Sequence, residues 1–372
     1  MMVGNVRKYI VLTVLALSQV VHSGGQVLQD TQTIDMIRNG VRCIYNYEFE
    51  QASVVSVYLE KKYPNHTVTY LFRGMTMYWQ YFPILPGTPE AEQYETCLGK
   101  GMEVAEQNLK DNEIVAENLL SALGSIGLLL LYYSDNGMSG KVFSMATKAY
   151  QWVMRSFDFT HSYKDFYFFT GLYNYYREAY ANAHPIYKPL LVFFPHGSTN
   201  IGLRQLKSAA DSSIFMKAEA VNFLSGIYMS FENNPARALL YSRKLRDAYP
   251  QNPQFKAGYI RDLLVIGKYG EAESLLKSMA NSSLNSFHQA QADVFRGIIM
   301  EKRYQNLKTA ESFYLSGIDK IAPYGTIGNE FSAYGHYGLS RIYQSAGNMK
   351  LSRQYRKEAR DLSAFDHINF DN

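Results

Sequence analysis

Histidine and cysteine, the side chains that most often supply nucleophiles, bases and metal ligands, are few and scattered in this chain. None of its 8 histidines has a second histidine at the i, i+4 spacing that would direct two imidazoles of one helix towards a metal ion. His184 and His196 flank a proline-rich segment, where an isolated histidine is usually polar surface. The sequence Gly99-Lys100-Gly101 lacks the third glycine of a phosphate-binding loop, and no Gly-x-Ser-x-Gly nucleophile motif occurs. We therefore expect no enzymatic activity, no metal site and no cofactor.

Aromatic and arginine side chains are stronger candidates for a function, because they dominate binding hot spots and stack on carbohydrate rings. One group lies in the C-terminal part, beside the basic segment 350–360, and a solvated basic face is the alternative interpretation of that region. A second group lies in a proline-rich segment near the middle. The aromatic run at 163–180 covers every face of a helix, which favours a buried helix over a stacking platform. The predicted partner-binding residues are Arg261, Tyr334, Tyr337, Arg341, Tyr187, Phe193 and Phe194.

The composition limits the classes of protein that this chain can represent. Its 372 residues exceed what one compact core usually holds, so it contains either two domains or a repeat array. The 47% hydrophobic content excludes disorder of the whole chain, and 37 basic against 33 acidic residues argue against a nucleic-acid surface. With 2 cysteines, a disulfide scaffold is excluded. We expect Cys43 and Cys97 to be small buried hydrophobes, and the sequence leaves open whether they pair.

The N-terminus has the layout of a secretory signal. Arg7 and Lys8 precede the uncharged stretch 9–21, and small residues follow it. That stretch is shorter than the roughly 20 residues that span a bilayer, so we expect a cleaved signal peptide over 1–23 and an exported protein, periplasmic or secreted. The uncharged segment 118–134 contains several polar and glycine residues, which favours a buried core helix over a membrane span. We expect no integral membrane segment after cleavage, although association with the cell envelope is compatible with export.

Small residues and prolines recur at a fixed spacing. Gly40, Ala52 and Pro64 are separated by 12 and 12 residues, Gly226, Ala238 and Pro250 repeat this spacing, and Gly74 follows Gly40 by 34 residues. Such a period predicts a stack of helical hairpins. In each hairpin a small residue of the first helix allows close packing, a small residue of the second fits against it, and proline ends the unit.

These residues resemble the tetratricopeptide-repeat superfamily. The clearest instance has Gly267 at the turn, Tyr269 two residues on and Ala272 three beyond that, and the first and last units match in the same phase. The resemblance implies an all-α superhelix, or α-solenoid, of about eight tetratricopeptide-like hairpins. We expect a single domain over 30–364 and a C-terminal tail over 365–372. The predicted hairpins are 33–64, 67–110, 112–157, 164–211, 219–250, 253–282, 290–323 and 333–364.

Two proline-rich insertions, 82–89 and 183–199, interrupt the second and fourth hairpins. Around the second insertion, 163–279 resembles the mitochondrial inclusion-clearance group of tetratricopeptide proteins and similar exported bacterial proteins, through Gly171, Leu172 and Asn174, the aromatic loop to Gly197, and Gly202 with the residues after it. This resemblance implies a partly closed helical body used for protein or lipid-droplet association, with no catalytic residues. The export signal departs from a mitochondrial role.

The first helix of each hairpin lines the concave face in proteins of this kind, and here that face is predicted to be apolar. It lacks the Lys, Asn and Arg residues that clamp a peptide carboxylate. Such a groove either receives an apolar partner or is filled by the chain itself, and we favour filling by the insertions. The predicted inner residues are Ile34, Ile37, Val41 and Ile44, then Val68, Leu71, Met75 and Tyr78, then Ala220, Phe223, Ile227 and Ser230.

The sequence therefore predicts an exported protein-interaction module of tetratricopeptide type, without catalytic activity, whose partner is a protein or peptide of unknown identity. The alternative is a helical ligand-binding protein of the cell envelope that takes a glycan or an apolar small molecule. An enzyme is the third hypothesis, and it requires a cluster of titratable groups in a pocket.

Overall fold

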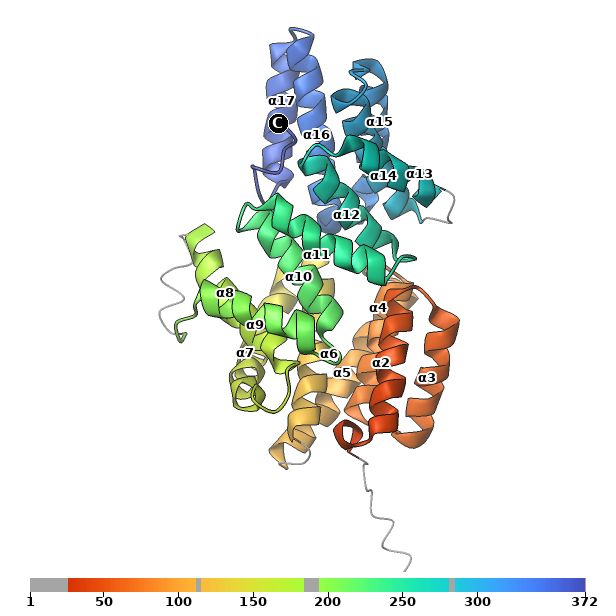
Figure 1. Ribbon diagram of the computed structural model, residues 1–372, viewed down its shortest axis with the longest axis vertical. Helices are drawn as coiled ribbons and strands as arrows, with labels where there is room; N and C mark the ends of the chain where they lie inside the picture. Colours follow the sequence, from red (N-terminus) through yellow and green to blue (C-terminus); the bar gives the residue numbers. More distant parts are fainter. Residues whose placement is uncertain (1–25, 112–114, 184–193, 281–284, 372) are drawn as a thin grey trace, which may run out of the picture.

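The computed structural model describes residues 26–111, 115–183, 194–280 and 285–371, and within these ranges the chain is all-α, with no strand. Its α-helices follow one another as antiparallel pairs, so the predicted helical solenoid is confirmed (Figure 1). The predicted signal peptide, 1–23, lies outside the described residues. The pairs are α2 (Thr31–Tyr45) with α3 (Phe49–Lys62), α4 (Thr67–Gln80) with α5 (Pro89–Lys110), α6 (Val115–Asp135) with α7 (Ser139–Ser156), α8 (Phe166–Ala183) with α9 (Thr199–Ser212), α10 (Lys217–Ser230) with α11 (Pro235–Ala248), α12 (Pro253–Val265) with α13 (Tyr269–Ala280), α14 (Ser286–Lys302) with α15 (Leu307–Ile321), and α16 (Asn329–Ser345) with α17 (Met349–Leu362).

Most hairpins share one turn. A residue with positive φ stands two positions before the second helix begins, and Gly267 (φ 75°) before α13 is the one that the sequence pattern identified. Glycine suits this left-handed conformation because it has no Cβ to clash. Elsewhere the same place is held by Tyr47, Gly137, Asn233, Gln305 and Gly347.

Local capping explains where the helices begin. The side chains of Asp30, Asn234 and Asn252 each accept a hydrogen bond from a backbone N–H of the first turn of the helix that follows. Pro235 and Pro253 then occupy the first helical position, where a missing N–H costs nothing. These short polar and proline signals are why the predicted hairpin boundaries are close to the observed ones.

The small residues of the first helices pack as predicted in the first two pairs but not in the fifth. A Cβ on Gly40 would lie 2.6 Å from the Phe72 ring, whereas a Cβ on Gly226 would meet nothing within 4 Å. In the fifth pair Ser225 takes the close-packing place and donates a hydrogen bond to the carbonyl of Ala238 over 3.2 Å. The repeat is therefore shifted by one residue here. Ala220 and Ile227, predicted to face the groove, are instead fully buried between helices.

The remaining framework residues behave as the repeat requires. Ala52, Ala238 and Ala272 are completely buried at helix contacts. Pro64 and Pro250 each come two residues after the second helix of their pair ends, at Lys62 and Ala248. A Cβ on Gly74 would lie 2.3 Å from Leu98. Cys43 and Cys97 are buried and not joined to one another.

The first pair meets the fifth and sixth pairs, so the superhelix completes a turn. The amide of Asn252 donates to the carbonyl of Tyr45 over 2.8 Å, and the Tyr45 hydroxyl donates to Glu219 over 2.6 Å. We call α2–α11 the ring, and α12–α17 the stack. In Figure 1 most of the ring lies below and α13–α17 lie above, with α10, α11 and α12 between them.

The insertion 82–89 joins the ring to the stack. Phe82 packs edge-on against Phe287 with a centroid distance of 5.8 Å, and its carbonyl accepts a hydrogen bond from Asn285. Ile84 is buried, and its carbonyl accepts from Asn136 at the end of α6. This proline-rich segment is therefore a structural contact between the two regions.

Candidate functional site

An apolar cavity of about 800 Å³ lies inside the ring. Its wall comes mainly from the first helices of the first five pairs, and α7 adds Val142, Ala149, Tyr150 and Val153. We call it the axial cavity. Its volume lies within the range of ligand pockets in proteins. Of the predicted inner residues, Ile37, Val41, Val68, Leu71, Met75 and Phe223 line it.

Helix α6 forms one side of the axial cavity, and its composition explains why that side is apolar and open. From Leu119 to Ser134 it carries no charge. By length and composition it is the described helix that could cross a membrane, yet 61% of its most apolar window is buried inside the protein. Gly124 accommodates Leu71, but a Cβ on Gly127 would meet nothing within 4 Å, so this glycine leaves space free in the cavity.

The predicted filling of the groove by the insertions is not what the described residues show. No residue of 82–89 lines the axial cavity, since that segment packs against the stack. Most of the second insertion, with the candidates Tyr187 and Phe193, lies outside the described residues. Phe194 is 37% exposed and packs edge-on against Tyr150, a cavity wall residue, at 4.9 Å. Phe194 therefore lies behind the wall rather than in the cavity.

A second cavity of about 490 Å³ adjoins the first, because Leu131, Tyr176, Glu219 and Phe223 line both. We call it the polar cavity. It lies between the ring and the stack, and Phe82 and Phe287 contribute to its wall. Its polar lining residues are Asp135, Glu219, Asn222, Gln254, Arg261 and Glu330, together with hydroxyl groups.

The carboxyl groups of the polar cavity are perturbed by burial. Burial raises the pKa of Asp135 from 3.8 to about 6, although the Tyr78 hydroxyl donates to this carboxylate over 3.4 Å and opposes the shift. Burial also raises the pKa of Glu219, and the hydrogen bond from Tyr45 opposes it. These groups are ionised at a cost that a nearby positive charge would relieve.

Arg261 lines the polar cavity but is already paired. Its guanidinium donates to Asp262 over 2.9 and 3.0 Å, and one nitrogen lies 3.4 Å from Glu330. Although burial alone lowers the pKa of Arg261, these carboxylates outweigh it and hold the pKa above the usual range. The predicted partner-binding arginine of the sixth pair is thus engaged by two carboxylates of its own chain.

The other predicted partner-binding residues of the C-terminal part contact the chain's own tail. Tyr334 and Tyr337 are each only 1% exposed. Phe370 packs edge-on against Tyr334 at 5.0 Å, and the Tyr337 hydroxyl donates to Asp366 over 3.1 Å. The tail residues therefore occupy the surface of Tyr334 and Tyr337 that an external partner would need to contact.

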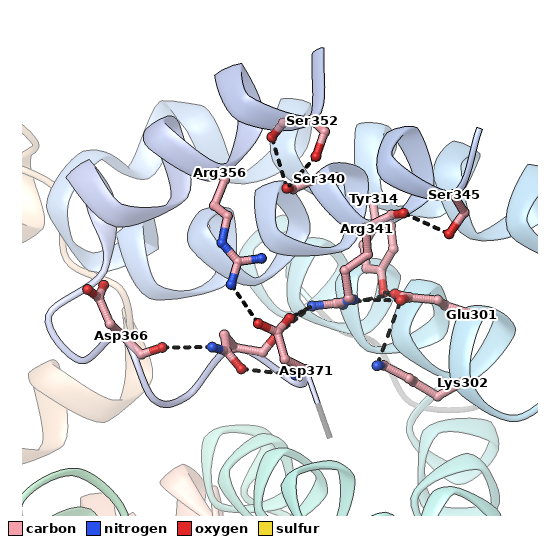
Figure 2. Close-up of polar contacts among 11 residues, drawn as sticks. Glu301, Lys302, Tyr314, Ser340, Arg341, Ser345, Ser352, Arg356, Asp366 and Asp371 are labelled. Atoms are coloured by element: carbon pink, nitrogen blue, oxygen red, sulfur yellow. Dashed lines mark hydrogen bonds and ion pairs between the residues drawn. The ribbon is translucent and has the colours of Figure 1, made fainter. Parts of the chain in front are cut away.

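Arg341 anchors the end of the tail (Figure 2). Its guanidinium donates to Glu301 over 2.6 and 2.9 Å, to the carbonyl of Asn369 over 2.5 Å and to Asp371 over 3.1 Å. Arg356 of α17 also donates to Asp371, over 2.7 Å. Figure 2 shows Asp371 between these two arginines, so the tail is fixed from both sides.

Sequence reasoning found the apolar character of the inner face and assigned Tyr334, Tyr337 and Arg341 to an external partner, but it missed three features. No motif includes Glu219 or Asp135. A carboxylate at a helix end is ordinarily solvent-exposed, so the sequence did not indicate that these two line a cavity. Gly226, which faces open space, was interpreted as a packing position, and Gly127 was interpreted only as a sign of a buried core helix. The tail carried a usable signal, since Ile368 and Phe370 are apolar residues that follow the last helix.

Metal-binding geometry and similarity to known proteins were also compared with the site. Among the residues that the structure describes, no group of three or more His, Cys, Asp or Glu side chains is placed to hold a metal ion. No known protein-family model matches the chain, and a comparison with curated proteins also finds no match. Arguments about function therefore rest on the cavities and the tail.

Proposed function

We propose that this protein is an exported helical-repeat binding protein that holds an apolar small molecule in its axial cavity, without catalysis. The observation that carries the proposal is the 800 Å³ cavity itself, whose wall is built almost entirely from apolar side chains. Apolar lining with a few polar groups at one end is typical of small-molecule sites. An apolar molecule fits this wall better than a glycan does, because a glycan needs many hydrogen-bonding partners.

Gly127, in the wall of the axial cavity, is consistent with the proposal. Glycine in a helix interior costs about 0.5–1 kcal/mol relative to alanine, and at this position no neighbouring atom requires the absence of a side chain. The helix therefore keeps an unfavourable residue where a larger one would intrude into the cavity.

We further propose that the repeats are of tetratricopeptide type and that the chain is exported to the periplasm or secreted. The turn shared by most hairpins, with Gly267 and Tyr269 in the clearest instance, supports the first statement. The charge and apolar pattern of residues 1–23 supports the second. Cell fractionation with detection of the mature N-terminus tests export.

The binding proposal is tested with linear alcohols of increasing length, measured by displacement of a fluorescent apolar probe. Burying each additional methylene contributes about 0.8 kcal/mol to binding, so affinity should rise roughly fourfold per carbon until the cavity is full. Gly127→Leu should weaken binding, most for the longest alcohols, because its side chain takes up part of the cavity. Gly99→Leu is the matched control, because Gly99 also meets nothing within 4 Å but lies on α5, away from the cavity. Equal binding by both variants contradicts the proposal.

Protein interaction is the second candidate, and the tail contacts favour it. The surface at Tyr334, Tyr337 and Arg341 holds the chain's own C-terminal segment through its aromatic and acidic side chains, which is the chemistry of a peptide-binding site. A peptide of residues 363–372 should bind in trans to protein that lacks 365–372. If it does not bind to folded, truncated protein, the tail contact is structural only.

A further inference from the structure

The two adjoining cavities differ in character, and together they fit an amphiphile, which has an apolar chain and a polar head. The axial cavity is apolar, whereas the polar cavity has carboxylates in its wall. Glu219 and Phe223 of α10 belong to both walls, so one molecule could place its chain in the first and its head in the second. This inference rests on the proposed binding of an apolar ligand and names its chemical class.

The charges around the polar cavity are unbalanced. Asp135, Glu219 and Glu330 line it, and the fully buried Asp262 lies behind Arg261. Arg261 is the one cation among the described lining residues, and its nitrogens are already bonded to Asp262 and Glu330. No lysine or histidine of the described residues lines either cavity. An anionic head would therefore meet repulsion with no free cation to receive it.

Glu219 is placed to meet the head. Its Oε1 accepts the Tyr45 hydroxyl over 2.6 Å, and no described residue donates to its other oxygen. Because α10 places this carboxylate where the two cavities share a wall, a group at the end of a hydrocarbon chain would reach it as the chain leaves the axial cavity. Asp135, at the end of α6, lies on the same cavity wall.

We propose that the ligand is a long-chain cationic amphiphile, with its hydrocarbon chain in the axial cavity and an ammonium head in the polar cavity beside Glu219 and Asp135. A primary ammonium supplies three donors and one positive charge. It would offset the carboxylate excess and bond the free oxygen of Glu219. A neutral alcohol supplies one donor and no charge, and a carboxylate supplies neither.

The test compares dodecylamine, dodecanol and dodecanoate on the full mature chain at pH 7.5, by displacement of a fluorescent apolar probe at concentrations below micelle formation. The three probes share one chain and differ in the head. At the effective dielectric of a buried site, one close charge pair changes binding by more than about tenfold, so the amine should bind at least tenfold tighter than the carboxylate, with the alcohol between them.

The variant Glu219→Gln tests the residue. It keeps an acceptor for Tyr45 but removes the charge, so the affinity for dodecylamine should fall by roughly tenfold while that for dodecanol is unchanged. Glu232→Gln is the matched control, because Glu232 accepts the Tyr175 hydroxyl over the same 2.6 Å but lines neither cavity. It should change the affinity for no probe.

The outcomes separate this inference from the proposed function. If none of the three probes binds, the apolar-ligand function itself fails, and the head assignment with it. If all three bind with similar affinity, or if Glu219→Gln weakens amine and alcohol alike, the cavity binds chains but the cationic head is wrong. Tight binding of dodecanoate would overturn the charge argument directly.

Discussion

The ring and the stack are built from the same helical hairpin, but the concave face of the ring lines a cavity and that of the stack contacts the chain's own tail. The ring curves around a half-open apolar cavity of about 800 Å³, whereas the last pairs of the stack hold the chain's own tail. The ring curves back on itself because its first pair meets the fifth and sixth, through Tyr45, Glu219 and Asn252. At the C-terminal pair, the residues that follow α17 cover the side chains of α16 instead.

A repeat pattern therefore specifies which residues form the inner surface but not what that surface contacts. Apolar residues at inner positions lead to a cavity where the superhelix closes. Aromatic and arginine residues at the same positions lead to a peptide contact where it does not. The predictions below test whether the two regions are separable, beginning with the largest expected effect.

Removing the aromatic anchor of the tail should destabilise the stack and leave the ring intact. Phe370 is 6% exposed and packs on Tyr334, so Phe370→Ala should cost about 3 kcal/mol. Hydrogen exchange followed by mass spectrometry should show faster exchange in α14 and α16. Phe143 on α7 has a side chain that is 75% exposed, so the control variant Phe143→Ala should change stability by less than about 0.5 kcal/mol. Equal acceleration in α2–α8 would mean that the two regions unfold together.

Acid should loosen the contact between the regions. Burial lowers the pKa of His288 from 6.5 to about 4, beside Phe82 of the insertion. His288 therefore binds fewer protons in the folded chain than in the unfolded chain between these values, so its own contribution to stability falls by about 2 kcal/mol at pH 5, and the raised pKa of Asp135 partly opposes this loss. Urea unfolding at pH 7.5 and pH 5 measures the loss. His288→Gln should reduce this pH dependence, and an unchanged slope would assign it to other groups.

Alanine at two glycines of equal repeat position should have opposite effects. Gly226→Ala places a methyl group in open space and should stabilise the chain by about 0.5–1 kcal/mol. Gly40→Ala forces a Cβ to within 2.6 Å of Phe72 and should destabilise it by about 1–3 kcal/mol. Thermal melts of both variants measure the two changes in stability. Destabilisation by both would restore the register predicted from the sequence.

The smallest effect is expected at the outer edge of the tail. Arg356 and Asp371 form an ion pair over 2.7 Å with both side chains about one-third exposed, so Arg356→Ala should cost less than about 1 kcal/mol. Arg341→Ala is the comparison, because it removes the two short hydrogen bonds to the buried Glu301, leaving it the Tyr314 hydroxyl and the more distant Lys302, and should cost about 3 kcal/mol. Denaturant unfolding distinguishes them, and similar costs would mean that burial is not what makes Arg341 important.

Much of the fold followed from local signals in the sequence. Asparagine and aspartate caps, proline at first helical positions and glycine at turns act within a few residues, so the hairpins were predicted close to their observed bounds. The site was predicted in part. Ile37, Leu71 and Met75 were assigned to the inner face by helical spacing, but Gly226 and its neighbours were misplaced by one residue because Ser225, equally small, could take the packing position.

Helix propensity, capping and periodicity are local properties, so the all-α hairpin array, its apolar inner face and the aromatic and arginine residues of its C-terminal part could be predicted without the fold. Only the tertiary structure decided that the array closes on itself, that a cavity remains inside, and that the tail returns to Arg341. Those outcomes depend on small rotations between successive pairs, which add up until Tyr45 meets Glu219 and Asn252 more than 170 residues away. The total rotation depends on every pair, so it cannot be predicted from any single segment.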